Sequence, residues 1–134
     1  MNAGFAWACE FGRTDVVAYL LQMGMDADAR LTQRGETGLH WAAHQAHVEI
    51  VRMLLERVAR VDAVDQSHQS TPLEWALFAW SNAKESARPA YYEVVAMLAR
   101  AGATLDPKHR LSTSTKLKSD ARMLAALQGQ LLPA

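Results

Sequence analysis

Residues 35–56, GETGLHWAAHQAHVEIVRMLLE, contain the clearest copy of the pattern that predicts the fold. Its Trp41-Ala42 pair recurs 34 residues earlier as Trp7-Ala8 and 34 residues later as Trp75-Ala76. A fixed period between about 20 and 50 residues indicates stacked repeats, because one short unit cannot bury its own apolar face and must pack on its neighbour. Repetition therefore predicts the architecture of this chain.

Aligning the tryptophans brings three further blocks into register, each with an acid, then two β-branched residues, then an apolar pair. These blocks are Thr14 to Leu21, Val48 to Leu55 and Tyr92 to Ala99. Apolar residues at i, i+3 and i+4 are typical of a helix with one buried face, so each block is expected to be the second helix of a unit. The first helices, rich in alanine, are expected around Phe5 to Phe11, Leu39 to Gln45 and Leu73 to Trp80.

Turn residues separate the expected helices. Gly12, with Ala46 at the matching place, suits the turn between the two helices of a unit. Gly24 and Gly102 follow the second helices of the first and third units, where glycine can supply a left-handed residue that ends the helix. Residues Val58 to Ala63 follow the second helix of the middle unit. Polar stretches at 32–36 and 66–70 are expected to form exposed turns.

The resulting unit is turn, helix, turn, helix, and residues 35–43 with 47–55 resemble an ankyrin repeat. Thr71-Pro72-Leu73-Glu74-Trp75-Ala76 opens another copy. The resemblance covers roughly residues 1–106, with several spaced positions agreeing in each of three copies. It implies an all-α ankyrin-repeat solenoid of helix-turn-helix units joined by hairpin-like turns, with units at about 1–30, 31–64 and 65–106.

Two departures from the repeat carry information. The third unit has ten extra residues near 81–90, between its two helices, which predicts a longer first helix or a projecting loop, with Pro89 in the first turn of the next helix. The first unit has Ala3 and Ala6 where the second has Thr37 and His40, so its first helix is expected to begin without a cap. The third unit, in contrast, has a predicted capping box, Thr71-Pro72-Leu73-Glu74.

Residues 107–134 lie outside the period. Residues 111–116 are polar and predict a loop, and Ser119 or Asp120 can cap a helix that Gly129 ends. This C-terminal helix is expected to close the stack with one apolar side, consisting of Met123, Leu124 and Leu127 together with Leu117 and Leu131.

Composition restricts the class of protein. The single cysteine, Cys9, excludes an internal disulfide and fits a reducing, cytoplasmic setting. No run approaches the roughly 18 to 20 apolar residues of a membrane helix, and no signal peptide is evident. Residues 1–106 carry 9 basic and 13 acidic groups, whereas residues 107–134 carry 5 and 1. Ten arginines against four lysines, with abundant alanine, point weakly to a bacterial genome.

Three histidines form the only pattern that suggests chemistry. His40, His44 and His47 are spaced at i, i+4 and i+7, which would suit a metal or small ligand if one helix carried all three. The resemblance favours structural roles for His40 and His47, and the helix should end before His47. No catalytic motif is present, so we expect no enzyme activity, no cofactor and no resident metal.

Two further binding classes are less favoured than their structural alternatives. Trp7, Trp41 and Trp75 could stack on bases or sugars, but equally spaced aromatics of first helices more often pack between repeats. The basic tail, with Lys108, Arg110, Lys116, Lys118 and Arg122, could contact phosphate, but a solvated tail or an intramolecular contact is favoured. Asp26, Asp28, Asp62 and Asp65 are interpreted as turn residues. We therefore expect no nucleic-acid and no membrane partner.

The resemblance implies a scaffold that binds an unidentified protein through the concave surface made by the turns and first helices. An alternative role is to block an enzyme by occupying its active face. The first unit's Phe5, Trp7 and Phe11 suggest missing upstream repeats or a covering chain, so the protein is expected to be a monomer or to associate end to end through this repeat. Candidate partner-binding residues are Glu10, Phe11, Arg34, Glu36, His44, Gln45, His68, Ser70, Phe78, Ala79 and Trp80, with Phe78 and Trp80 equally able to pack under the insertion.

Overall fold

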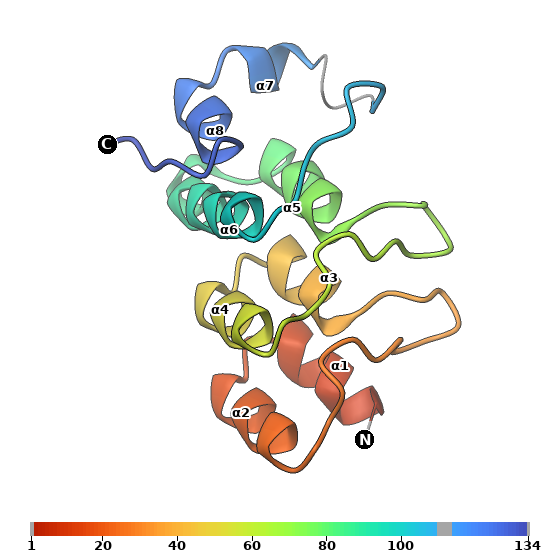
Figure 1. Cartoon of the computed structure of the whole chain (residues 1–134). Helices are drawn as coiled ribbons and strands as arrows, with labels where there is room; N and C mark the ends of the chain where they lie inside the picture. Colours follow the sequence, from red (N-terminus) through yellow and green to blue (C-terminus); the bar gives the residue numbers. More distant parts are fainter. Residues whose placement is uncertain (1, 110–113, 134) are drawn as a thin grey trace.

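The computed structural model describes residues 2–109 and 114–133, and within these ranges it contains helices and turns but no strand. Figure 1 shows α1, α3 and α5 stacked in one row and α2, α4 and α6 in a second row. This arrangement confirms the predicted all-α solenoid. The helices are α1 (Asn2–Glu10), α2 (Thr14–Gln22), α3 (Gly38–His44), α4 (Val48–Glu56), α5 (Pro72–Ser81), η1 (Glu85–Ala87), α6 (Arg88–Arg100), α7 (Thr115–Lys118) and α8 (Ala121–Ala126).

Left-handed backbone conformations end the helices, as the turn residues predicted. Gly12 and Ala46 have φ angles of 72° and 56° between the two helices of their units. Gly24 and Gly102 have φ angles of 98° and 104° after α2 and α6. Val58, which is 34 residues after Gly24, adopts the same conformation with φ 58°. The fold thus forces a β-branched residue into a region that favours glycine.

The core lies between the two rows of helices and runs through all the repeats. Ala42 and Ala76 of the first helices are fully buried, and such small side chains let neighbouring helices approach closely. Second helices contribute Val17, Ile50 and Val94, each fully buried. The predicted pattern of buried faces is therefore confirmed, while the exact unit boundaries at 30/31 and 64/65 stay predictions.

The insertion forms a compact connection and lengthens the second helix. After α5 the chain makes a short turn and the 3-10 helix η1, and then α6 begins at Arg88 with Pro89 in its first turn. Residue 88 is four positions before Tyr92, the residue that aligns with the start of α4, so α6 gains about one turn at its N-terminus. The extra residues thus lengthen both helices of the unit, because α5 has 10 residues against 7 in α3, as the expectation of a longer first helix stated, and α6 gains its additional first turn.

The C-terminal segment covers the third repeat, but with a different set of side chains than expected. Leu117 and Met123 are buried, whereas Leu124 and Leu131 are 42% and 48% exposed, which corrects the expectation for these two leucines. Asp120 caps α8 by accepting a hydrogen bond from the Met123 amide (3.0 Å). The predicted loop is partly wrong, because Ser114 caps the additional helix α7 through the Leu117 amide (3.0 Å). Residues 111–113 of this predicted polar loop, and Arg110 of the basic tail, lie outside the described residues.

The described helices are all too short or too polar to cross a lipid bilayer.

Candidate functional site

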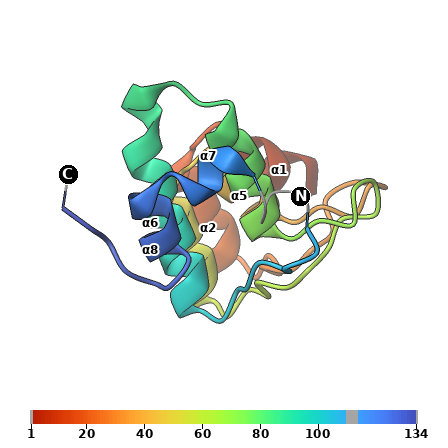
Figure 2. The ribbon, with the colours of Figure 1, turned by 90° about the horizontal axis from the view of Figure 1, so that it is seen from above.

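The turns between repeats project on the same side of the stack as the first helices (Figures 1 and 2). Backbone hydrogen bonds link one turn to the next, because the Gln66 amide donates to the Arg34 carbonyl at 2.6 Å. The Arg30 guanidinium bridges the same turns by donating to the Gly35 carbonyl (2.6 Å) and the Val64 carbonyl (2.7 Å). These bonds make the turns a continuous surface.

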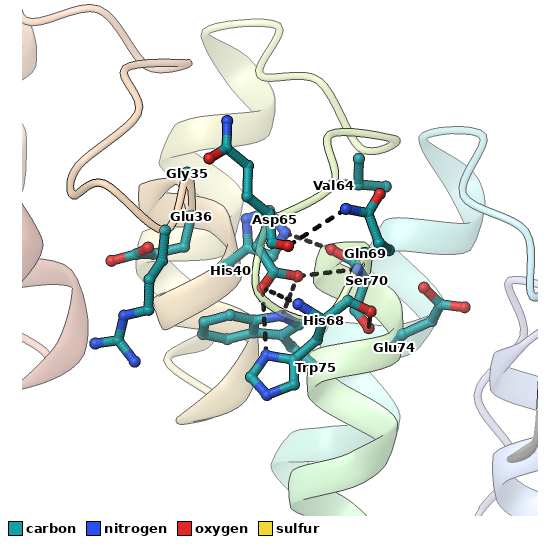
Figure 3. A network of polar contacts seen from close by, with 12 residues as sticks. Gly35, Glu36, His40, Val64, Asp65, His68, Gln69, Ser70, Glu74 and Trp75 are labelled. Carbon is teal, nitrogen blue, oxygen red and sulfur yellow. Dashed lines mark hydrogen bonds and ion pairs between the residues drawn. The ribbon is translucent and has the colours of Figure 1, made fainter.

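Asp65 is the centre of the polar network that supports this surface (Figure 3). Its carboxylate is 1% exposed and accepts hydrogen bonds from the amides of Ser70 and His68 (both 2.9 Å) and from the indole of Trp75 (3.3 Å). Burial alone would raise the pKa of Asp65, but these bonds outweigh it and lower the pKa below its ordinary value. Asp65 therefore remains an anion that fixes the turn and the Trp75 ring, which confirms its interpretation as a turn residue.

His40 connects the second repeat to the third. Its Nδ1 accepts a hydrogen bond from the Thr37 amide (3.0 Å), which places the proton on Nε2, and Nε2 donates to the Ser70 carbonyl (2.9 Å). Burial lowers the pKa of His40 in spite of the bond to Ser70, so the ring is neutral at physiological pH. The structural role predicted for His40 is confirmed.

His47 connects the second repeat to the first, and its position argues against a three-histidine metal site. Its Nε2 lies 2.8 Å from the Glu10 carbonyl, and its ring fills the space that a Cβ at Gly12 would occupy. His47 precedes α4, outside the helix that carries His40 and His44. Over residues 2–109 and 114–133, no three His, Cys, Asp or Glu side chains are placed to hold one metal ion.

An aromatic cleft of about 380 Å³ opens between α3 and α5, with residues of the first helices and of the turn at 68–70 in its lining. The Trp41 and Trp75 rings meet nearly at right angles (86°) with their centroids 5.4 Å apart, and the His44 ring lies 5.9 Å from that of Trp75. Phe78, 48% exposed, adds an aromatic side chain to the lining. The complete lining consists of Trp41, His44, His68, Ser70, Glu74, Trp75, Phe78 and His109.

Hydrogen bonds hold the walls of this aromatic cleft in place. The Tyr91 hydroxyl donates to the His44 carbonyl at the end of α3 (2.7 Å), and Asp65 holds the Trp75 indole. Burial lowers the pKa of His44, against a smaller opposing effect of Glu10, so this ring is neutral. Glu74 forms the predicted capping box with Thr71, and its Oε2 lies 3.4 Å from the Nε2 of His109. The cleft is thus formed before any ligand binds.

The aromatic cleft gathers four of the predicted partner-binding residues, namely His44, His68, Ser70 and Phe78. Phe11, Arg34 and Gln45 are exposed elsewhere, and Glu10 and Ala79 are half-buried. Two residues are corrected because both are 1% exposed: Trp80 is part of the core, and Glu36 accepts hydrogen bonds from the Thr32 hydroxyl at 2.9 and 2.8 Å. Neither side chain is accessible to a partner.

Four residues of the lining were absent from the sequence prediction: Trp41, Glu74, Trp75 and His109. Helical spacing could have identified the tryptophans, because Trp41 and Trp75 stand three residues before His44 and Phe78 on the same helices. Interpreting them only as packing residues was incomplete. His109 follows the repeats, and only the return of the chain beside α5 brings it to Glu74.

Comparison with known proteins agrees with this architecture. A family model described as ankyrin repeats (three copies) matches residues 5–109. Inversin of Danio rerio is 40% identical over 65 residues, which is 48% of this chain and 6% of that protein. Inversin of Gallus gallus is 40% identical over 63 residues, 46% of this chain and 6% of that protein.

A third relative is an enzyme, but the similarity is at the level of the repeats. Palmitoyltransferase Hip14 of Drosophila melanogaster is 38% identical over 103 residues, 77% of this chain and 14% of that protein. The chain thus spans 6% to 14% of the length of these relatives, and their animal origin does not support the bacterial source suggested by composition. Because the family model covers most of the chain, this protein belongs to the ankyrin-repeat family, whose repeats are in general non-catalytic modules of protein interaction.

Proposed function

We propose that this chain is a non-enzymatic scaffold that binds a protein partner through its concave surface, with the aromatic cleft receiving an anchoring side chain of that partner. The observation that carries the proposal is the cleft itself, which combines two perpendicular indoles with Phe78 and His44. Aromatic side chains dominate binding hot spots because they bury a large area while few rotatable bonds lose freedom.

The network around Asp65 supports this role because it prepares the surface in advance. The hydrogen bonds to Ser70, His68 and Trp75 fix one turn and one wall of the cleft together. A partner that binds such a surface does not have to order it, so less of the interaction free energy is lost. Cys9 is a free, buried thiol, and a cytoplasmic location is part of this proposal.

Photo-crosslinking tests where the partner binds. We would place benzoylphenylalanine at position 78 and, as a matched control, at position 124 on α8, where Leu124 is similarly exposed. Purified protein irradiated in an extract should give crosslinked partners from position 78 but not from position 124, identified by mass spectrometry. Crosslinks that form only from position 124 would place the interface on the C-terminal helices and contradict the proposal.

Binding of the identified partner to two variants then tests the cleft. Phe78→Ala should weaken binding by roughly tenfold or more, as expected for an aromatic anchor, while the unfolding midpoint changes little because the ring is half exposed. Arg52→Ala, on an exposed arginine of α4 paired with Glu49, is the control and should bind normally. Equal affinity of the Phe78 variant would remove the cleft from the interface.

A second proposed property is end-to-end self-association through the first repeat. Tyr19 and Met23 are 59% and 62% exposed on α2 and its C-cap, and Trp7 and Phe11 are exposed on and just after α1. The residue that matches Met23 in the second repeat, Arg57, contacts the preceding repeat by donating to the Leu21 carbonyl (3.3 Å). Light scattering should show a concentration-dependent dimer that Met23→Glu abolishes, and a monomer at all concentrations would disprove this property.

A further inference from the structure

A second, polar cleft lies away from the concave surface, where the insertion meets the C-terminal helices. Its volume is about 460 Å³, and it lies between η1, the first turns of α6, and α8. Figures 1 and 2 both show α8 beside α6. The lining consists of Glu85, Ser86, Arg88, Pro89, Tyr92 and Arg122. Four of these six residues, Glu85, Ser86, Arg88 and Pro89, belong to the insertion near 81–90 that breaks the 34-residue period.

Two arginine Nε donors in this polar cleft have no acceptor among residues 2–109 and 114–133. The Nε atoms of Arg88 and Arg122 are both buried and have no hydrogen-bond partner among the described residues. Neither arginine forms an ion pair within that part of the chain. Buried donors in native proteins are nearly always hydrogen-bonded, so two orphaned donors in one cleft indicate that an acceptor belongs there.

The nearby carboxylates do not satisfy these donors. Asp120 is already used, because one of its oxygens accepts from the Tyr92 hydroxyl (2.6 Å) and the other from the Met123 amide (3.0 Å). Glu85 lines the cleft but is not within ion-pair distance of either arginine. The Arg122 guanidinium lies 4.5 Å from the centre of the Tyr92 ring, which orients it without neutralising its charge.

We propose that this polar cleft binds a phosphate-type oxyanion between Arg88 and Arg122. A guanidinium presents its N–H donors as a planar fork that matches two oxygens of a phosphate, so two such groups suit one tetrahedral anion. The Ser86 hydroxyl can supply a further donor, and Arg88 begins a 13-residue helix whose N-terminus favours negative charge. The anion is a phosphate group, either carried by a protein side chain as a phosphomonoester or free in solution as inorganic phosphate. This site is separate from the aromatic cleft, so either can fail without the other.

Calorimetric titration at constant ionic strength tests the site with three probes: inorganic phosphate, a short phosphoserine peptide, and the same peptide without phosphate. The protein should bind the first two and not the third. A phosphopeptide that binds more tightly than inorganic phosphate assigns the site to a phosphorylated protein segment, and equal affinities assign it to the free anion. Absence of binding by both phosphate-containing probes at millimolar concentration would overturn the proposal.

Variants test the assignment of the two arginines. Arg88→Gln and Arg122→Gln should each weaken binding by roughly tenfold or more, because each removes a charge-assisted donor pair. Arg52→Gln, which removes an exposed arginine paired with Glu49, is the matched control and should leave binding unchanged. Since Arg122 packs on Tyr92, Arg122→Lys is added to keep the charge and the stem, and it should bind more tightly than Arg122→Gln. Wild-type affinity in both glutamine variants would exclude this site.

Discussion

Replacing Val58 by glycine should stabilise this protein, although the change removes a side chain. Val58 has a φ angle of 58° at the end of α4, where the matching residue of the first repeat is Gly24 and the residue that ends α6 is Gly102. The same bonds close all three helix ends: the Val58 and Ala59 amides donate to the Leu55 and Leu54 carbonyls at 2.9 and 3.0 Å. Only the residue type differs, so the strain is local.

The magnitude follows from the backbone and from exposure. A non-glycine residue in the left-handed conformation costs about 1–2 kcal/mol, with a β-branched residue near the upper limit. Glycine in turn lowers the free energy of unfolding by roughly 0.5–1 kcal/mol, because it gives the unfolded chain more conformational freedom. Little packing is lost because Val58 is 82% exposed. The net expectation is a gain of about 0.5–1 kcal/mol and a rise in Tm of roughly 2–5 °C.

Urea unfolding followed by circular dichroism measures this gain as a higher midpoint at an unchanged slope. Val58→Ala should have little effect, because alanine keeps the steric conflict of a Cβ at positive φ. Val64→Gly is the matched control: Val64 is also partly exposed (41%) but does not have a positive φ angle, so glycine there should destabilise. A Val58→Gly protein that is no more stable than the wild type would show that the positive φ angle of Val58 does not cost stability.

Three further predictions concern buried groups. His40→Ala should lower the free energy of unfolding by about 2–4 kcal/mol, because the Thr37 amide and the Ser70 carbonyl lose their hydrogen-bond partner. Urea unfolding measures this loss, and a loss below about 1 kcal/mol would contradict the prediction. The folded-state pKa of Asp65 is lowered, so its stabilisation is complete above the unfolded value of about 3.9 and is lost as the pH falls through the folded-state pKa. Asp65→Asn should therefore be less stable than the wild type at neutral pH and show a smaller loss of stability on acidification, whereas parallel profiles would exclude this role. Burial raises the pKa of Cys9 to about 12, so a thiol reagent should label the folded protein far more slowly than the urea-unfolded chain, and equal rates would show that the thiol is accessible.

Much of the fold could be predicted because the same helix and turn signals recur in each of the three repeats. The tryptophan period, the β-branched pairs and the Thr71 to Glu74 capping box each identify a helix from residues close in sequence. The left-handed conformation of Val58 was not predicted, because valine itself disfavours that conformation, although its register with Gly24 indicated it. The fold holds it there through the hydrogen bonds that end α4.

The candidate sites were predicted less completely. Phe78 and His44 were placed on the concave surface by their positions in the repeat, but Glu36 and Trp80 were assigned to it wrongly. The repeat pattern specifies which side of a helix a residue occupies, and it does not specify what covers that side. Trp80 is covered by its neighbours in the core, and Glu36 turns inward to the Thr32 hydroxyl.

The helix pairs, their turns and their order in the stack follow from the amino-acid sequence alone, because local periodicity, capping residues and turn residues specify them. The two clefts could not be predicted in this way, because each joins residues far apart in the chain and forms only when the repeats pack together. The aromatic cleft needs Trp41, Trp75 and His109 to meet, and the polar cleft needs Arg88 to face Arg122. Local propensity acts over a few residues, whereas these long-range contacts depend on how the repeats pack on one another and on the path of the chain after α6.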